Sequence, residues 1–530
     1  MTNKHDIVII GAGHNGLVCG TYLAKAGFDV CALERRTVVG GPVVSEEVWP
    51  GYQISVASFV MSLMQPRVIL DLDLLAHGLE VIPIPPTFQP FPDGRHLVLW
   101  PDVAKTCTEI SKFSKKDAEA YPDYIETLQG MIPYLRRLLW EIPFDPVSGR
   151  SGDVLKALKF AWRYRDVGRR FYDIYDLLTL SAYDFLSRWF ESPQVMAALG
   201  SYASGSGGNI SPMSPGSAYV LIRTMLRDNN TAAGDWGLVR GGMGSIAKAI
   251  EASGKQHGLK IKTSAEVDRI LVREGKTVGV ALKTGEELLA DTVVSNASAQ
   301  MTYLNLIEPA ELDPAFLSNV RRFRSKSSCF KINIAAERAP VYPMFDKGEV
   351  GFDYPVATVI APSVEYLERA FDDSKHGGIA REPYLWTLVP SVLDRTIAPE
   401  GRHVVSIFGG HVSHTLKDGD WDNGGRAKLW ANVVKAMSKF APDFEDCVID
   451  KQILTPMDLE RIFALPGGHV HQGEISLDQV FLKRPVPGYA DYRSPLKNLY
   501  MCGASVHPGG GVTGVPGYNA ASVILKDLRG

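Results

Sequence analysis

The chain has 530 residues, 45% of them hydrophobic, so it is long enough for two or three substructures around a large core. Its 56 basic and 59 acidic residues nearly balance, which excludes the strongly basic surface expected of a nucleic-acid-binding protein. The six cysteines are far apart and form no CxxC pair, which suits a reducing compartment and argues against disulphide-relay chemistry. We expect no metal site, because the close histidine pairs, His411 with His414 and His469 with His471, have no Cys or HExxH partner.

The first 34 residues predict a strand, a glycine turn, a helix and a second strand. An apolar run from Asp6 to Ile10 leads into the turn Gly11-Ala12-Gly13-His14-Asn15-Gly16. A helical stretch from Leu17 to Ala26 follows, and the apolar run from Asp29 ends in Glu34. This order, with the spacing GxGxxG and a closing acid, is the fingerprint of a βαβ unit that binds a dinucleotide. The helix N-terminus would offer free N–H groups to a pyrophosphate, and Glu34 would accept hydrogen bonds from a ribose.

The glycines of this region favour FAD over NAD. Gly11 allows the tight turn, Gly13 lets the backbone approach a pyrophosphate, and Gly16 lets the helix pack closely on the sheet. A second pair, Gly40-Gly41, follows the acid. NAD-binding folds need no second close approach there, whereas a flavoprotein chain passes beside the FAD pyrophosphate and ribityl. An ordinary Gly-Gly turn is the alternative.

The middle of the chain alternates between strand-rich and helical blocks. Prolines break short strands over 81–100, and the pattern is helical over 105–227. An α/β pattern returns over 234–297. Alternating strands over 328–409 predict an antiparallel sheet, with an amphipathic helix over 428–440 on it.

One helical segment, 153–170, allows peripheral membrane contact. Leu155, Leu158 and Trp162 share one face of the predicted helix, and basic residues share the other. Arg165 and Arg169 fall on the apolar side and interrupt the pattern, which favours an ordinary covering helix. No apolar run reaches the roughly 18 residues that a membrane-spanning helix needs.

The C-terminal segment predicts a strand, a glycine loop and a final helix. Gly509, Gly511 and Gly514 repeat the spacing GxGxxG, but Pro508 and Pro516 flank them and no ribose-binding strand follows. Backbone amides at the start of a helix suit the flavin N1/O2 edge, which gains negative charge on reduction. A flexible glycine loop is the alternative. Because no second dinucleotide fingerprint is found, oxygen, a quinone or a second organic substrate is the expected electron acceptor, rather than NAD.

Six blocks of sequence carry a resemblance that spans nearly the whole chain. They are Glu34-Arg35-Arg36 with Gly40-Gly41, Val56-Ala57-Ser58-Phe59, Gly241-Gly242-Met243-Gly244, Val293-Val294-Ser295-Asn296-Ala297, Leu465-Pro466-Gly467-Gly468-His469, and Leu499-Tyr500 through His507-Pro508-Gly509-Gly510-Gly511. The chain resembles phytoene desaturase-type FAD-dependent oxidoreductases. It is most similar to the branch called pyridine nucleotide-disulphide oxidoreductase domain-containing protein 2, although it lacks the CxxC pair that this name suggests.

The resemblance implies an α/β fold with a discontinuous, Rossmann-like FAD-binding domain of the glutathione-reductase and amine-oxidase type. An inserted α+β substrate domain and a helical subdomain complete the fold. It also implies non-covalent FAD and hydride transfer to or from flavin N5, in the desaturation, dehydrogenation or saturation of a large hydrophobic, carotenoid- or retinoid-like molecule. The predicted FAD-binding domain comprises 1–70, 234–300 and 488–530, the substrate domain with its antiparallel sheet 71–104 and 301–487, and the helical subdomain over the substrate cavity 105–233.

Two other functions stay open from the sequence. A flavin amine oxidase has the same fold, and its aromatic cage cannot be located from sequence alone. A non-catalytic FAD-bound interaction protein is the alternative of a different class. The first strand begins near Asp6, so we expect no leader peptide and a cytoplasmic protein, with peripheral membrane association left open.

The candidate site residues follow from the turn, the loop and the resemblance. His507, beside the C-terminal loop, is the candidate for proton transfer, with packing of the loop as its alternative role. His469, His471 and Tyr518 are candidates to line the substrate cavity. The predicted cofactor-binding residues are Gly11, Ala12, Gly13, Asn15, Gly16, Glu34, Arg35, Gly40, Gly41, Pro42, Val267 (through its backbone, to adenine), Asn296, Gly503, Ala504, Gly510, Gly511 and Val512.

Overall fold

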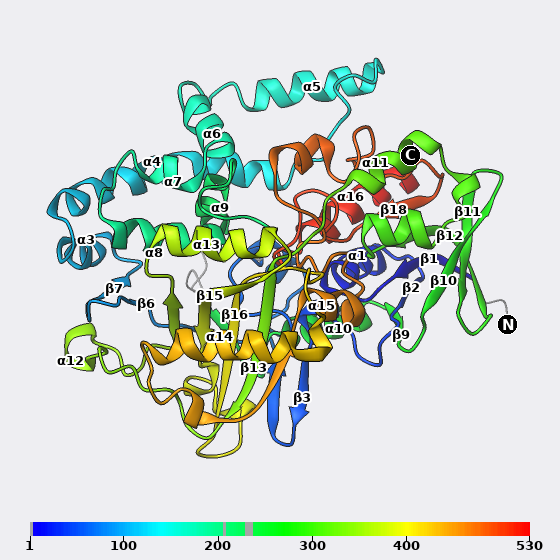
Figure 1. The fold of residues 1–530 in the computed structure, drawn as a ribbon. Coiled ribbons are helices and arrows are strands. Elements are labelled where there is room, and N and C mark those ends of the chain that lie inside the picture. The colour runs from blue at the N-terminus through cyan, green and yellow to red at the C-terminus, as the bar shows by residue number, and fades with distance from the viewer. Residues whose placement is uncertain (1–3, 205–207, 228–236, 530) are drawn as a thin grey trace.

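Two seven-stranded sheets and a group of helices form the protein in the computed structural model, which describes residues 4–204, 208–227 and 237–529 (Figure 1). The expected α/β organisation is confirmed. The predicted boundary between the helical subdomain and the second part of the FAD-binding domain, at 233/234, lies outside the described residues. No helix among the described residues is both long enough and apolar enough to cross a membrane.

The first sheet joins three segments that are far apart in the sequence. Its strand order is β10-β11-β12-β1-β2-β9, and β18 also pairs with β12. The start of β12 pairs with antiparallel β11, whereas its end, at Val293–Ser295, pairs with parallel β18. The strands are β1 (Lys4–Ile10), β2 (Val30–Leu33), β9 (Lys260–Lys262), β10 (Val267–Arg273), β11 (Lys276–Leu282), β12 (Glu287–Ser295) and β18 (Leu499–Met501).

Helices bury the central strands of this sheet. All four residues of β2 and the last four of β1 are buried, which explains why both read as unbroken apolar runs. Helix α1 (His14–Lys25) packs on both α10 (Gly244–Gln256) and α16 (Val515–Arg529), and all three share one core with the strands. The two ends of the chain therefore meet at the predicted cofactor turn.

The second sheet has the order β17-β13-β16-β15-β14-β6-β7. The antiparallel sheet predicted over 328–409 is confirmed, since β13, β16, β15 and β14 pair in antiparallel fashion. Strand β6, from outside that range, joins its edge and lies parallel to β14. The hairpin of β6 and β7 comes from a distant part of the chain, so local strand patterns could not show this pairing. The strands are β6 (Thr87–Pro90), β7 (His96–Leu99), β13 (Cys329–Ala336), β14 (Ala357–Ile360), β15 (Ile379–Leu388), β16 (His403–Val412) and β17 (Val448–Leu454).

The two faces of the second sheet have different neighbours. Leu385 packs in one core with α14 (Arg426–Ser438), the helix predicted over 428–440. The next residue, Trp386, points to the opposite face, where it packs with Phe408 and with α13 (Val364–Lys375). This second face extends to the candidate site.

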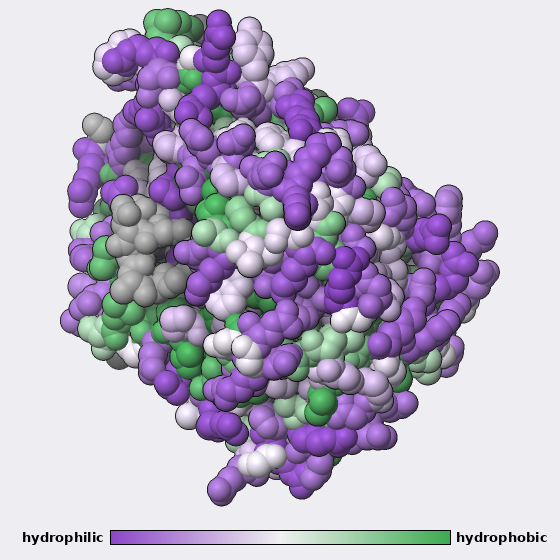
Figure 2. All heavy atoms as spheres, turned by 90° about the vertical axis from the view of Figure 1, so that its left-hand side faces the viewer, coloured by the Kyte–Doolittle hydropathy of each residue, from purple (hydrophilic) through white to green (hydrophobic). Residues whose placement is uncertain are grey.

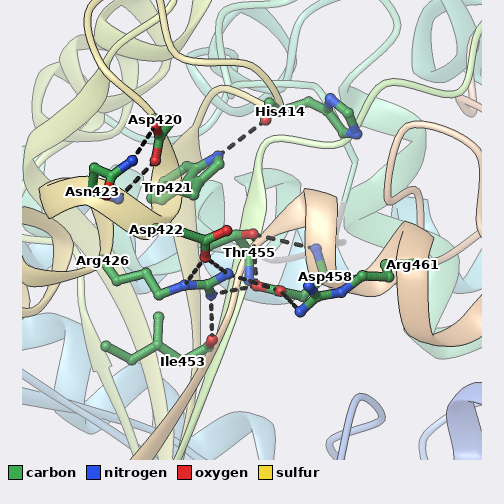
Figure 3. A network of polar contacts seen from close by, with 10 residues as sticks. All are labelled: His414, Asp420, Trp421, Asp422, Asn423, Arg426, Ile453, Thr455, Asp458 and Arg461. Carbon is green, nitrogen blue, oxygen red and sulfur yellow. Dashed lines mark hydrogen bonds and ion pairs between the residues drawn. The ribbon is translucent and has the colours of Figure 1, made fainter.

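A polar network ties α14 to α15 (Pro456–Phe463) (Figure 3). The Arg426 guanidinium lies 2.9 Å from Asp458 Oδ1, and Asp458 also accepts the Thr455 N–H at 2.9 Å in a capping box. Arg35 in turn donates to the Arg461 carbonyl at the end of α15, at 3.3 Å. The network thus connects the second sheet to the segment that follows β2.

The helical subdomain has its own apolar core and a projecting end. Helix α5 ends at Arg163, and Gly168, with φ of +52°, lies in the turn that leads to α6, so the prediction of one helix over 153–170 is wrong. Arg165 and Arg169 therefore lie outside α5. The helices are α3 (Val103–Ser111), α4 (Lys115–Leu139), α5 (Ser151–Arg163), α6 (Arg170–Thr179), α7 (Ala182–Leu186), α8 (Pro193–Ser204) and α9 (Ala218–Arg223).

Shorter elements complete the described chain. Two antiparallel pairs lie outside the large sheets: β3 with β4, which form a hairpin, and β5 with β8, which come from distant parts of the chain. Their bounds are β3 (Ser45–Trp49), β4 (Tyr52–Ser55), β5 (Val81–Pro83) and β8 (Gly237–Val239), and the remaining α-helices are α2 (Pro66–Asp71), α11 (Pro314–Arg322) and α12 (Lys347–Val350).

Candidate functional site

The two predicted glycine segments lie side by side. The Gly11 N–H donates to the Leu33 carbonyl at 2.7 Å, and the Gly40 N–H donates to the Ala12 carbonyl at 2.9 Å. A Cβ atom on Gly16 would lie 2.3 Å from the Gly11 carbonyl oxygen, so only glycine fits there. The turn and the second glycine pair therefore form one surface of bare backbone, as close approach to a pyrophosphate requires.

The Glu34 carboxylate closes the end of β2 beside this surface. It accepts hydrogen bonds from the Ala12 N–H and the Arg36 N–H, each at 3.0 Å. Glu34 as a whole is buried, with 6% of its surface exposed. The Glu34 carbonyl accepts the Ala265 N–H at 2.8 Å, which brings the start of β10 and Val267 next to the turn. This placement suits the predicted contacts of Glu34 with ribose and of Val267 with adenine.

The start of α1 has the donor groups that a phosphate needs. Its first turn contains no acid, and no side chain caps it. His14 Nε2 and Asn15 Oδ1 are buried without a hydrogen-bond partner, and burial lowers the pKa of His14 to about 4, so the imidazole is neutral. A helix N-terminus with free N–H groups is an anion site, and the residues present therefore fit the pyrophosphate of FAD.

A cavity with about 1350 Å³ of empty space opens from this surface toward the second sheet. Among the described residues that line it there is no Asp, Glu or Lys. Its apolar wall comes from distant elements, with Phe59 after β4, Trp386 on β15 and Phe408 on β16. Nine of the predicted site residues line it: Gly13, Asn15, Pro42, Asn296, His471, Ala504, Gly510, Gly511 and Val512.

The other predicted cofactor residues lie around the cavity. A Cβ atom on Gly41 would lie 3.5 Å from Gly13 Cα, and one on Gly503 would lie 2.6 Å from the Asn296 carbonyl oxygen. Both glycines thus allow close packing next to residues that line the cavity. Arg35 points away from it, toward the end of α15.

Three predicted residues are misplaced for the roles expected of them, since none lines the described cavity. His507 Nε2 lies 2.8 Å from the Leu138 carbonyl, and burial lowers the pKa of His507 to about 4, so its imidazole holds the C-terminal loop against α4. Tyr518 packs edge-on against Tyr22 and Trp140 on the far side of α16. His469 is fully buried, and burial lowers its pKa to about 3.

Three buried cations near the site were not predicted from the sequence. Lys331 donates to Ser406 Oγ at 2.6 Å on the site face of the second sheet, and burial lowers its pKa to about 7. Arg223 lines the cavity. Within the described residues, Arg484 donates to backbone carbonyls, those of His471, Gly473, Glu474, Gln479 and Ala504. No local pattern distinguishes these cations from surface cations, because only the tertiary fold buries them.

The comparisons with known proteins agree with this geometry. The sequence pattern of the flavin-containing amine oxidoreductases matches residues 16–525. The chain belongs to this family. The resemblance to phytoene desaturase-type flavoproteins is confirmed, and the cofactor is FAD.

Several known proteins are similar to nearly the whole chain. Pyridine nucleotide-disulfide oxidoreductase domain-containing protein 2 of Rattus norvegicus is 37% identical over 99% of this chain and 94% of its own length. A limonene dehydrogenase subunit of Castellaniella defragrans is 27% identical over 99% and 95%. The zeta-carotene-forming phytoene desaturase of Myxococcus xanthus is 25% identical over 97% and 92%.

Solved structures share the fold at low sequence identity. Putrescine oxidase bound to putrescine matches with a TM-score of 0.57 at 14% identity, over the full length of both chains. Cyclohexylamine oxidase from Brevibacterium oxydans matches with a TM-score of 0.58 at 16% identity, over 99% of this chain and 100% of its own. These likenesses confirm the amine-oxidase type of FAD-binding fold.

Proposed function

We propose that this flavin oxidoreductase transfers a hydride between flavin N5 and a carbon atom of a large apolar molecule. FAD, when bound, supplies the hydride acceptor or donor. The observation that carries the proposal is the cavity, whose wall of Phe59, Trp386 and Phe408 faces the glycine loop of residues 510–512. The names of two relatives, one a component of a limonene dehydrogenase and the other a phytoene desaturase, support a hydrocarbon-like substrate.

In this proposal the residues of the chain position the substrate and exclude water. The aromatic side chains hold an apolar body against the site, and hydride transfer needs little more than correct placement and a dry environment. The Arg223 guanidinium lies 3.2 Å from His471 Nε2, and a guanidinium only donates, so this nitrogen is an acceptor already in use. We therefore assign no proton transfer to His471.

The cavity favours this substrate class over amines. A protonated amine entering it would meet the cationic Arg223, and no carboxylate among the described lining residues would stabilise the ammonium. A flavin amine oxidase is the second candidate, supported by the family to which the chain belongs and by the shared fold.

We propose oxygen, a quinone or a second organic substrate as the electron acceptor. NAD is disfavoured because it would need a binding turn of its own. FAD occupies the glycine turn at the start of α1, and the sequence contains no second dinucleotide fingerprint.

We propose a cytoplasmic protein that touches membranes through the end of its helical subdomain. On α5, Leu155, Leu158 and Trp162 are 52–67% exposed, and α6 adds the exposed aromatic residues Phe171 and Tyr172. Helix α5 projects at the top of Figure 1, and hydrophobic as well as hydrophilic residues are exposed at the top of Figure 2. Because α5 ends at Arg163, no arginine interrupts its apolar face, and Arg165 lies over the Trp162 ring at 3.7 Å. Such a face beside basic residues suits an anionic lipid surface.

Product analysis tests the proposed reaction. The FAD-loaded protein is incubated with apolar alcohols, polyenes and amines, under air with peroxide detection and under nitrogen with a quinone. We expect oxidised products from the apolar alcohols or polyenes. Turnover of amines alone would contradict the proposal, and flavin that no compound reduces would favour the non-catalytic interaction protein.

A further inference from the structure

Arg223 reaches the cavity from the helical subdomain. It is the last residue of α9, in the helical subdomain above the second sheet (Figure 1), and only 8% of it is exposed. Its guanidinium donates to the Gly510 carbonyl and to His471 Nε2. A Cβ atom on Gly511 would lie 3.0 Å from Arg223 Nη2, so the cation lies directly over the glycine loop.

The charge of Arg223 has no carboxylate partner among the described residues. Its contacts among the described residues are with the Gly510 carbonyl and the His471 imidazole, and neither is a carboxylate. A second buried cation, Arg484, lies nearby and makes the region more positive. It donates to the carbonyl of His471, the same residue that Arg223 contacts, at 2.9 Å. Burial and the charge of Arg223 lower the pKa of Arg484 to about 9, and burial also lowers the pKa of Arg223. A buried charge of this kind is costly unless an anion binds it.

The nucleotide end of FAD does not supply this anion. Its pyrophosphate is expected at the start of α1, where neutral N–H groups of the backbone are free. Arg223 belongs instead to the helical cover, and it lies beside the apolar wall that contains Leu63 and Val220. An occupant that satisfies both features has an apolar body and one anionic end.

We propose that Arg223 binds the carboxylate of an apolar acid, which is the substrate or a close analogue of it. This inference rests on the proposed function and specifies its substrate class. Each Nη atom carries two N–H groups and makes one contact with the part of the chain that the structure describes, which leaves one N–H on each atom for a carboxylate. Arg484 holds His471 in place through the His471 carbonyl, so in this proposal Arg223 alone binds the carboxylate.

Calorimetric titration of the FAD-loaded protein tests the inference without turnover. A long-chain carboxylic acid is compared with its methyl ester, its primary alcohol and the alkyl phosphate of the same chain. We expect the acid to bind at least about tenfold more tightly than the ester or the alcohol, as one charge-assisted pair allows, and more tightly than the phosphate.

Three variants complete the test. Arg223→Gln removes the preference for the acid and leaves the affinity for the ester unchanged, while Arg223→Lys keeps part of the preference. Arg188→Gln is the control, because it removes a half-exposed cation that pairs with Asp176 in the same subdomain, away from the cavity. Flavin absorbance confirms that each variant retains FAD and is folded.

Several outcomes would overturn the inference. They are equal affinity for acid and ester, tighter binding of the phosphate, or an acid preference that survives in Arg223→Gln. A shift of the flavin reduction potential in Arg223→Gln with no change in the ratio of acid to ester affinity would assign the cation to the cofactor instead. None of these results would contradict hydride transfer from a neutral apolar substrate, which is measured separately.

Discussion

Gly13 and Asn296 meet where the cofactor backbone is expected to pass. A Cβ atom on Gly13 would lie 2.8 Å from Asn296 Nδ2, and both residues line the cavity. The backbone of Gly13, at φ of −68°, suits any residue, so a larger side chain acts by its volume alone.

We expect Gly13→Val to weaken FAD binding at least about 100-fold, or about 2.7 kcal/mol, while the fold is retained. The measurement is the ratio of flavin to protein after purification, with circular dichroism as the check on folding. Gly152→Ala is the matched control, because a Cβ atom there meets nothing within 4 Å. Stoichiometric flavin in Gly13→Val would refute the cofactor assignment of the turn.

Asp458 carries a pH-dependent part of the stability through its contacts with Arg426 and Thr455. Burial would raise its pKa, but Arg426 and Thr455 outweigh this effect and hold the pKa below its ordinary value. A depressed pKa in the folded state stabilises the protein above the ordinary value, near 3.9, and this contribution is lost as the pH falls through the folded-state pKa.

We therefore expect Asp458→Asn to lower the free energy of unfolding by about 3 kcal/mol at neutral pH, and by less below about pH 4. Urea unfolding at several pH values measures it. Asp422→Asn removes the more exposed partner of the same Arg426 and is expected to cost less than about 1 kcal/mol. Equal losses in the two variants at neutral pH would contradict this account.

At the scale of elements, helix α5 either contacts membranes, as proposed, or has a purely structural role, and its exposed face allows a test between the two. Its exposed face should bind vesicles that contain anionic lipid, more weakly at high salt. Trp162→Glu should reduce this binding at least about tenfold, since it removes a large apolar side chain from the interface and adds a negative charge. Val341→Glu, at a residue 58% exposed elsewhere, is the control. Vesicle binding unaffected by Trp162→Glu, or no binding by the unaltered protein, would exclude this surface.

The elements that the sequence predicted well are those defined by local patterns. The βαβ unit needs only one strand–turn–helix–strand run, and the predicted elements match β1, α1 and β2 within a few residues. The break between α5 and α6 was missed because the side-chain pattern continues through it, whereas the backbone leaves the helix after Arg163 and turns at Gly168. The parallel pairing of β6 with β14 joins residues about 270 positions apart, so no local signal could indicate it.

At the scale of the whole molecule, the site was predictable where it is made of backbone and not where it is made of side chains. The glycine turn, Gly40-Gly41 and the loop of residues 510–512 come together as expected, because close approach requires glycine. The sequence did not indicate Arg223 as a site residue, because only the tertiary fold places the end of α9 over the glycine loop. His507 was a reasonable candidate by position, but the fold turns its ring toward the Leu138 carbonyl.

The cavity thus combines an FAD cradle with apolar walls contributed by the second sheet and the helical subdomain. Anaerobic mixing of the FAD-loaded protein with paired compounds of one apolar skeleton, one bearing an alcohol and one an amine, tests the proposed function most directly. We expect the alcohol, or an unsaturated hydrocarbon of similar size, to bleach the visible flavin band and the amine to leave it unchanged. Bleaching by the amine alone would contradict it.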